Sequence, residues 1–314
     1  MAKLVGDKGA YKGNLRGSPR AFGGLMEGIS VEAMNQVSSD WDMFYESFNR
    51  RIDTIAEAEL LGMTENGVNS PTGTPAMLGS RESGYLDMFP GTKDDAGSTI
   101  QFNKATTISG GNTTETLAPQ TIGPLVSTTT LMDNRSIVCT TRVKFQPEAA
   151  VTTDGAKYLW GWCVDDTAPI ATGTDVITLD TGGGIGFFLD ASGDLQAFYQ
   201  AVTADTPIME DTGVDITVIA ASQTWYGLGF RVDWIDASAG TGLMTWYVDD
   251  EDAGTGWTKV HSVTGSGTST GLPMQSTETY SITYTVINGA AGKGADGFFI
   301  SDLFTAITKP GRLA

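Results

Sequence analysis

Large apolar residues alternate with small or charged ones through much of the second half of the chain. The pattern is clearest in residues 225–235 (WYGLGFRVDWI), where Tyr226, Leu228 and Phe230 are separated by glycines. Because successive side chains of a β-strand point to opposite faces, the alternation predicts a strand with one buried face and one solvent face. Similar stretches recur and predict about a dozen strands.

The predicted strands are separated by turns rich in Gly, Asp, Ser and Thr. Residues 190–194 (DASGD) favour a hairpin turn, with Gly193 suited to a positive φ. No helical pattern intervenes, so the order of strands predicts an antiparallel sandwich or jelly roll. We expect strands near residues 99–104, 113–117, 136–145, 157–164, 184–189, 194–200, 214–219, 225–235, 243–249, 257–263, 280–287 and 298–304.

Residues 30–62 show a different period. Their apolar residues recur at steps of three and four, which predicts an amphipathic helix that Ser30 caps and Gly62 ends. Residues 38–40 (SSD) favour a break into two pieces. The apolar face packs either on the chain's own sandwich or on another subunit, and the pattern leaves both open. This face includes Trp41, Phe44, Phe48 and Ile52.

Two other segments lack periodicity. Residues 1–29 combine Gly and Pro with spaced basic residues, which predicts an extended basic arm that becomes ordered against a partner. Residues 63–95 are rich in Gly, Pro, Asn and Ser, which predicts a linker or surface loop. The expected organisation is therefore arm, helix, linker and, from residue 96 to 314, a β-sandwich domain.

The charge is strongly acidic and unevenly distributed. The formal net charge is −18, yet residues 1–24 carry five basic residues against Asp7 alone, a local +4. The other 290 residues carry −22, which disfavours nucleic-acid binding. Neither a secretory signal in the first ten residues nor an apolar run of membrane-spanning length is evident. We therefore expect synthesis in the cytoplasm and no membrane association.

Four segments carry a resemblance to a known family. They are residues 182–200 (GGGIGFFLDASGDLQAFYQ), 224–234 (TWYGLGFRVDW), 243–251 (LMTWYVDDE) and 296–307 (DGFFISDLFTAI). In this order they resemble the concanavalin A-like lectin/glucanase jelly roll, over about two-thirds of the chain, and are similar to such domains in structural proteins of tailed bacteriophages. The resemblance implies a mainly β fold, an antiparallel sandwich preceded by the arm and helix. A fold does not determine a function.

Residues that could carry catalysis are scarce. Glycanases of this fold use a Glu-x-Asp-x-(x)-Glu strand, and that motif does not occur here. The acidic run 249–252 (DDED) alternates faces, which favours a solvated turn, with a calcium site as the alternative. His261 is the single histidine, so there is no histidine cluster for zinc, and a catalytic triad would depend on this residue alone. We expect no enzyme activity, no cofactor and no metal.

The tryptophans and cysteines are read mainly as core residues. Alternation places Trp160, Trp162, Trp234 and Trp246 on inner faces, whereas Trp225 and Trp257 lie near strand starts and are the possible glycan contacts. Cys139 and Cys163 fall in predicted strands. They are interpreted as buried thiols, with a disulfide as the open alternative.

These observations lead to two hypotheses. The first is a non-enzymatic phage virion protein, a capsid decoration or cement protein. Its arm and helix (Arg16, Arg20, Trp41, Phe44, Phe48 and Ile52) would bind the major capsid protein or another virion protein, or sister copies in a homo-oligomer. Removing residues 1–62 should then leave a folded sandwich that no longer assembles. The alternative is a carbohydrate- or receptor-binding module of a tail fibre or virion surface, with Trp225 or Trp257 contacting a glycan; a degenerate glycan hydrolase is a weaker third.

Overall fold

The computed structural model contains only β-strands as regular elements in the part of the chain that it describes. These residues are 41–46, 63–68, 76–80, 85–89, 97–102, 106–107, 114–115, 136–146, 155–164, 169–171, 176–179, 183–201, 206–216, 224–236, 241–251, 254–265, 280–288 and 297–308. Among them no helix is long and apolar enough to cross a membrane. The strands are β1 (Trp41–Glu46), β2 (Met63–Val68), β3 (Ala76–Ser80), β4 (Tyr85–Phe89), β5 (Gly97–Phe102), β6 (Thr106–Thr107), β7 (Thr114–Glu115), β8 (Ser136–Gln146), β9 (Lys157–Val164), β10 (Gly184–Leu189), β11 (Asp194–Gln200), β12 (Ile208–Asp215), β13 (Tyr226–Asp236), β14 (Thr241–Asp250), β15 (Thr258–Gly265), β16 (Tyr280–Ile287) and β17 (Gly297–Thr308).

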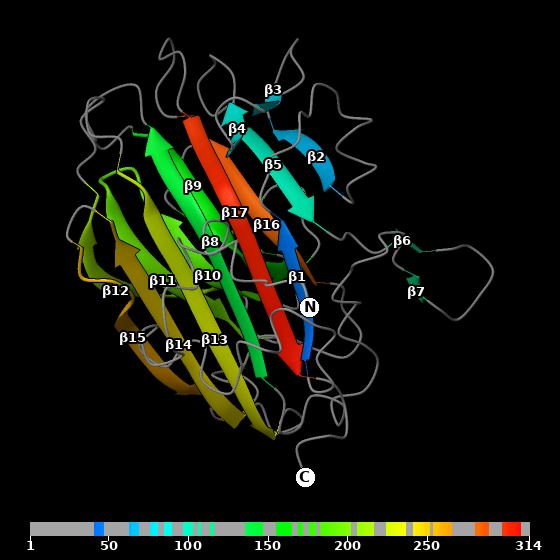
Figure 1. Ribbon diagram of the computed structural model, residues 1–314, viewed down its shortest axis with the longest axis vertical. Coiled ribbons are helices and arrows are strands. Elements are labelled where there is room, and N and C mark those ends of the chain that lie inside the picture. The colour runs from blue at the N-terminus through cyan, green and yellow to red at the C-terminus, as the bar shows by residue number, and fades with distance from the viewer. Residues whose placement is uncertain are drawn as a thin grey trace, which may run out of the picture.

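Two large antiparallel sheets form a sandwich (Figure 1). Sheet A has the order β15-β14-β13-β8-β17-β4-β3, and β1 also pairs with β17; sheet B has the order β12-β11-β10-β9-β16-β5-β2. The sheets meet through large side chains. Trp160 of sheet B lies 5.3 Å from Phe230 of sheet A, measured between ring centroids, and Trp246 Nε1 donates a hydrogen bond across the sandwich to the Gly186 carbonyl at 2.9 Å. The protein is thus mainly β, consistent with a jelly roll.

The core lies between the two sheets and is rich in aromatic residues. All eight residues of β9 and all six of β10 are buried, so the middle of sheet B is covered on both faces. In antiparallel pairs, residues opposite each other pack side by side on one face, which is how Trp160 and Phe187 come to stack. The largest fully buried side chains are Trp160, Trp246, Tyr158, Tyr284, Phe187, Phe188, Phe198, Phe230 and Phe298.

The predicted strands of the sandwich are largely confirmed. The bounds of β9, β10, β11 and β16 coincide with the predicted intervals, and those of β13 are shifted by one residue. The strand expected at residues 214–219 differs, because β12 spans Ile208–Asp215. Its register shifts opposite Leu195 and Gln196, so Thr212 and Gly213 bulge out and obscure the alternation in the sequence.

The predicted hairpin turn between β10 and β11 is also confirmed. Gly193 has a φ of +93°, which only glycine adopts without strain. Asp190 Oδ1 accepts hydrogen bonds from the backbone N–H groups of Ser192 at 2.9 Å and Asp194 at 3.0 Å. The turn thus uses the side chain of its first Asp as a backbone cap.

The predicted amphipathic helix at residues 30–62 is wrong for residues 41–46. These six residues form β1, which pairs antiparallel with β17 from Trp41 opposite Thr308 to Glu46 opposite Leu303. The sequence WDMFYE suits either period, and pairing with β17 decides between them, because tertiary contacts override local preference. The rest of the interval lies outside the described residues, as do the arm at 1–29 and the residues Arg16, Arg20, Phe48 and Ile52.

The predicted linker at residues 63–95 contributes strands instead. β2 pairs with β5 in sheet B, and β3 and β4 pair with each other and extend sheet A beyond β17. Short strands rich in Gly and Ser have no clear period of their own, so the sequence signal for them is weak. The sandwich therefore draws on residues before 96.

The buried tryptophans and the cysteines agree with the sequence prediction. Trp160, Trp162 and Trp246 are buried in the core. Cys139 and Cys163 are buried free thiols, so the disulfide alternative is wrong. The side chain of Trp234 lies outside the described part.

Candidate functional site

One end of the outer face of sheet A gathers aromatic and charged side chains from five segments. Val143 and Phe145 of β8 belong to the core, so the alternate residues Arg142 and Lys144 lie on the face that points away from sheet B. Phe299 of β17 is directly opposite Lys144, and Asp87 of β4 is directly opposite Phe299. Three neighbouring strands thus place Asp87, Phe299 and Lys144 in one row.

Trp225, immediately before β13, continues this row on the other side of β8. Its ring centroid lies 5.4 Å from Arg142 Cζ and 5.6 Å from Lys144 Nζ. Lys144 Nζ also lies 4.4 Å from the ring centroid of Phe299, so the ammonium group sits close to two aromatic rings. Each such cation–π contact is worth about 0.5–1 kcal/mol at an exposed site and more when desolvated. Lys144 is only 6% exposed.

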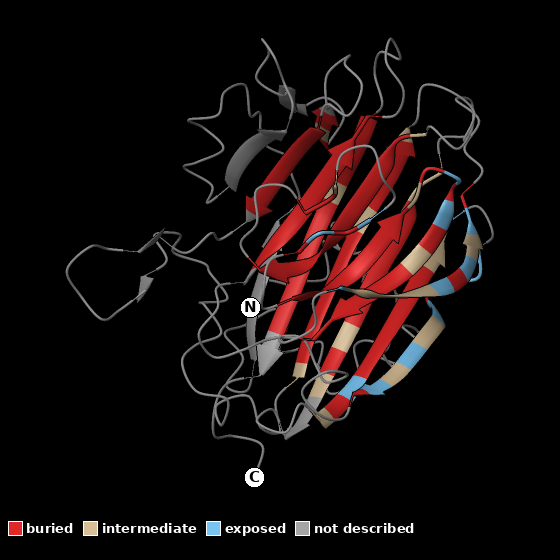
Figure 2. Ribbon diagram, turned by 180° about the vertical axis from the view of Figure 1, so that it is seen from behind, coloured by how far each residue is buried: buried red, intermediate tan, exposed pale blue. Residues whose placement is uncertain are grey.

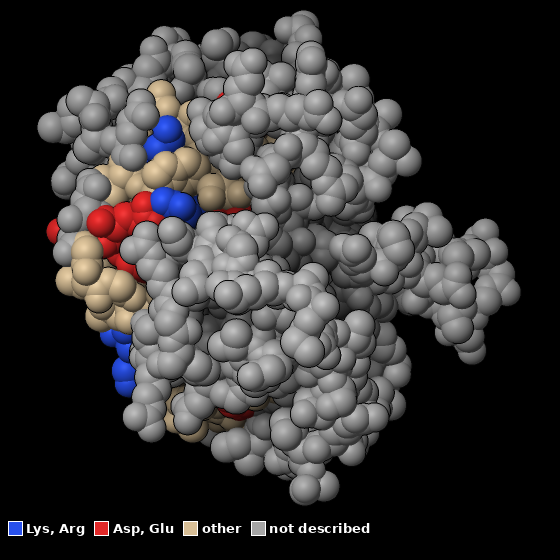
Figure 3. All heavy atoms as spheres, viewed as in Figure 1, with Lys and Arg blue, Asp and Glu red and all other residues tan. Residues whose placement is uncertain are grey.

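Arg142 joins this cluster to the end of β14. Its guanidinium forms an ion pair with Glu251, the residue that follows β14. The side chains are 27% and 32% exposed, and partly solvated pairs contribute about 0–1 kcal/mol. The pair orients Arg142 next to Trp225 more than it stabilises the fold. Figure 3 shows acidic and basic side chains side by side in the described part of the molecular surface.

Asp87 and Lys144 have opposed pKa shifts. Burial raises the pKa of the Asp87 carboxyl from 3.8 to about 7, and the positive charge of Lys144 partly offsets this effect. Burial also lowers the pKa of Lys144, while the Asp87 carboxylate acts in the opposite direction. Desolvation disfavours the charged form of each group, and their mutual attraction favours it. The Asp87 carboxyl therefore changes between its protonated and ionised forms near neutral pH.

Trp257 lies at the same end of sheet A, against Gly227. A Cβ atom at position 227 would lie 3.0 Å from Cη2 and Cζ2 of the Trp257 indole, and 3.0 Å from Asp249 Cβ. Gly227 therefore makes room for the ring, which is 8% exposed. Of the two possible glycan contacts, Trp257 is therefore buried and Trp225 is half-buried. Trp257 thus packs against β13 two residues beyond Trp225 in sequence.

Arg142, Lys144 and Asp87 were missed in the sequence. Alternation in the predicted strand at residues 136–145 puts Arg142 and Lys144 on one face, which was the available signal. Nothing local indicated that Trp225 would lie beside them, because β8 and β13 are 80 residues or more apart in sequence and meet only through the sheet register. Asp87 lay in the predicted linker.

Asp190 and His261 have structural roles. Asp190 accepts turn hydrogen bonds, and its Oδ2 accepts one from Gln196 Nε2 at 3.1 Å. His261 packs its ring 5.6 Å from that of Trp246. Within the described ranges no three His, Cys, Asp or Glu residues converge in a way that could hold a metal ion. A calcium site at residues 249–252 stays untested, because Asp252 is outside these ranges.

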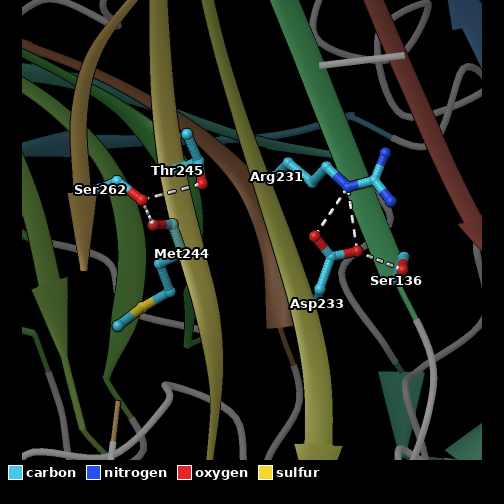
Figure 4. Close-up of polar contacts among 6 residues, drawn as sticks. All are labelled: Ser136, Arg231, Asp233, Met244, Thr245 and Ser262. Carbon is cyan, nitrogen blue, oxygen red and sulfur yellow. Dashed lines mark hydrogen bonds and ion pairs between the residues drawn. The ribbon is translucent and has the colours of Figure 1, made fainter. Parts of the chain in front are cut away.

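Two small polar clusters lie toward the opposite end of the same outer face. Arg231 Nε donates to Asp233 Oδ1 at 2.9 Å and Oδ2 at 2.8 Å, and the Ser136 hydroxyl donates to Asp233 (Figure 4). Ser262 donates to the Met244 carbonyl at 3.3 Å and also contacts Thr245 Oγ1. The first group of contacts links β8 to β13, and the second links β14 to β15. The cluster around Trp225 is the stronger candidate for binding.

Comparisons with known proteins give no family assignment. No family model matches the sequence, and no curated protein matches it. Solved structures that are similar include the endo-1,3-beta-glucanase from Streptomyces sioyaensis, with a TM-score of 0.49, 10% identity and coverage of 87% of this chain and 98% of that one. The CBM2 module of the evolved Dit of Lactobacillus casei BL23 phage J-1 has a TM-score of 0.43 and 11% identity, covering 86% and 97%. Arcelin-5, a lectin-like defense protein from Phaseolus vulgaris, has a TM-score of 0.46 and 7% identity, covering 86% and 99%.

These neighbours are jelly rolls of the concanavalin A-like lectin and glucanase type. Their TM-scores are below 0.5, so the likeness carries no argument about what this chain binds. The arguments below rest on its own residues.

Proposed function

We propose that this protein is a non-enzymatic structural protein of a virus particle, most simply a capsid decoration or cement protein. One observation carries the proposal, namely the polarity of sheet A. β1 pairs with β17 so that Trp41 is opposite Thr308, and the chain before residue 41 and after residue 308 therefore departs from the same end. Phe298 and Phe145 pair at the other end, beside the Trp225 cluster.

The sequence segments that precede β1 and follow β17 are basic. Residues 1–24 carry a net +4, and residues 309–314 add Lys309 and Arg312 without an acid. Residues 25–308 then carry −24, because both basic tails lie outside them. Basic segments of this kind suit attachment to an acidic protein surface such as a capsid shell. Arg16 and Arg20 would be among the contacts. The acidic body and the Trp225 end would face outward.

Non-enzymatic action is part of this proposal. The two carboxylates of the candidate site each have a cation beside them: Glu251 pairs with Arg142, and Asp87 faces Lys144. A glycosidase needs two carboxyl groups that flank one bond, one as acid and one as base or nucleophile. The arrangement around Trp225 is better suited to binding than to that chemistry.

Electron microscopy with immunogold labelling tests the proposal. Antibodies against the exposed edge strand β15 would be applied to intact particles of the virus that encodes the chain. Label spread over the capsid supports a decoration protein, and label confined to the tail supports the receptor-binding alternative. Absence of the chain from purified particles, measured by mass spectrometry, would overturn a virion role.

Carbohydrate binding is the second candidate, favoured by the half-buried Trp225 beside two cations. An aromatic ring supplies a stacking surface for a sugar, and Arg142 and Lys144 suit a sugar that carries a carboxylate. A glycan array compares the unsubstituted chain with Trp225→Ala, and Trp257→Phe is the control. Binding lost only with Trp225→Ala supports this function.

A further inference from the structure

The edge of β17 between Leu303 and Thr308 needs a partner strand. β8 pairs with one edge of β17 from Gly297 to Ile307, whereas on the other edge β4 pairs only with Phe298–Ile300 and β1 pairs with Leu303–Thr308. Leu303, Thr305 and Ala306 are fully buried. Backbone N–H and C=O groups beside buried side chains are costly when they lack hydrogen bonds. The edge of β17 from Leu303 to Thr308 therefore requires a paired strand, from this copy or from another.

β1 is held there by its pairing with β17. Among the described strands it pairs with no other, so it lies at the side of sheet A beside β17 (Figure 1). Its sequence fits a helical period as well as a strand period, so local preference does not by itself favour the strand. The strand conformation is imposed by the β17 edge, and any chain that offers this edge can impose it.

The sequence between β1 and β2 is long enough for the strand beside β17 to come from another copy of the chain. Sixteen residues separate Glu46 from Met63, and an extended chain of that length reaches about 50 Å. A β1 strand makes the same contacts with β17 whether it comes from the same copy or from another. The choice then depends on the effective concentration of β1 at the β17 edge of its own copy, which is about millimolar when two sites are joined by a short linker. Copies crowded on a shell reach comparable local concentrations.

We propose that β1 is an exchangeable strand, and that β1 of one copy pairs with β17 of a second copy when copies are concentrated. Such strand exchange joins identical chains without requiring a new interface. The setting on a particle rests on the proposed function, but the exchange itself is measured on purified full-length chains. Either idea can therefore fail without the other.

Disulfide trapping tests the exchange. Asp42 and Ile307 are directly opposite in the register, and opposed residues have Cα atoms about 4.5–5.5 Å apart, within disulfide range. Full-length chains with Asp42→Cys and mass-tagged chains with Ile307→Cys are mixed at about 10 μM and at about 1 mM, incubated and then oxidised. Cys139 and Cys163 are buried and stay in place. Linked dimers are identified by non-reducing gel and by mass spectrometry of the joined peptides.

The matched control uses the hairpin of β14 and β15, whose strands are separated by only seven residues in sequence and therefore pair within one copy. Leu243 and Thr264 are opposite in its register and both are exposed, so Leu243→Cys and Thr264→Cys chains are mixed in the same way. We expect the linked dimer from the Asp42→Cys and Ile307→Cys mixture to rise about tenfold or more with concentration, above the control. A yield equal to the control at both concentrations overturns the proposal. A single chain with both substitutions should close its own disulfide at low concentration, which verifies the register.

Discussion

At the scale of single residues, two glycines determine how closely the central strands of sheet B approach. Gly161 of β9 and Gly186 of β10 are directly opposite, and a Cβ at 186 would lie 2.1 Å from the Trp160 carbonyl oxygen and 2.5 Å from the Gly161 Cα. The carbonyl of Gly186 also accepts the hydrogen bond of Trp246. A side chain here would push apart the strands that hold this cross-sandwich contact.

We therefore predict that Gly186→Ala is far more harmful than Gly227→Ala. At 186 the obstacle is backbone, and the expected loss in the free energy of unfolding is about 3 kcal/mol or more. At 227 the nearest atoms belong to side chains that can shift slightly, so we expect a loss of about 1 kcal/mol. Urea unfolding followed by tryptophan fluorescence measures both. Equal losses would show that the close approach of β9 and β10 does not matter for stability.

The pair Asp87 and Lys144 makes stability depend on pH. The Asp87 carboxyl has a pKa of about 7 in the folded chain against 3.8 as its ordinary value, because burial disfavours the carboxylate. Between about pH 4 and pH 7 the folded state holds a proton that the unfolded state has lost. This contribution to stability is fully present below about pH 4 and is lost as the pH rises through about 7.

We predict that Asp87→Asn flattens the pH dependence between about pH 5 and 7.5. Asn stays neutral, so it removes the group whose protonation couples to folding. The free energy of unfolding is measured by urea titration at several pH values in this range. Asp215→Asn, which neutralises an exposed carboxylate on β12, is the control and should keep the slope of the unsubstituted chain. An unchanged slope in Asp87→Asn would mean that the carboxyl is ionised throughout.

At the scale of elements, the edge strands β12 and β15 are built to resist pairing with other chains. Each carries a register shift, opposite Leu195 and Gln196 for β12 and opposite Trp246 and Tyr247 for β15. Both also carry many exposed or half-exposed residues, which mark the free edge of the sandwich in Figure 2. Bulges and charges are common protections of edge strands. Association through this side of the sheets is therefore disfavoured.

Replacing Asp211 and Asp215 of β12 by Val should create an associating edge. Both residues are exposed, and Asp211 also accepts a hydrogen bond from the Gly213 N–H in the bulge at 2.7 Å. The double substitution removes two charges and one bulge contact, and adds residues that favour strands. Static light scattering should show a mass that grows with concentration beyond that of the unsubstituted chain. Asp→Glu at both positions keeps the charge and should not have this effect.

At the scale of the whole molecule, sheet A has two unlike ends. Both tails leave at the end where β1 and β17 begin their pairing, and the row of Asp87, Phe299, Lys144 and Trp225 lies at the other. Removal of residues 1–62 was expected from the sequence to leave the sandwich intact, but it would take away β1. The boundary between attachment and sandwich therefore falls before Trp41.

This boundary predicts different outcomes for two truncations. A chain that begins at Trp41 keeps β1 and should unfold at nearly the same temperature as the full chain. A chain that begins at Ser47 lacks β1 and opens the β17 edge, so its midpoint should fall by about 5 °C or more. Differential scanning calorimetry at one protein concentration measures both. Identical midpoints for the two truncations would show that β1 adds nothing to the sandwich.

The sequence alone determined the elements whose own residues carry a clear period. Apolar runs bounded by turn residues located β9, β10, β11 and β16 to the residue, and alternation identified Trp160, Trp162 and Trp246 as core, because both are local signals in the sequence. It also predicted the turn at Gly193, since few residues adopt a positive φ. The mainly β sandwich follows from these elements together.

Only the tertiary structure decided what depends on pairing between distant segments. β1 is a strand because β17 offers it an edge, although its sequence also fits a helix. Trp257 is buried because Gly227 of another strand leaves it room. Asp87 and Lys144 influence each other because β17 holds β4 and β8 on its two sides. The register between strands is set by long-range packing, and a local pattern of hydrophobic residues contains no record of which strands will be neighbours.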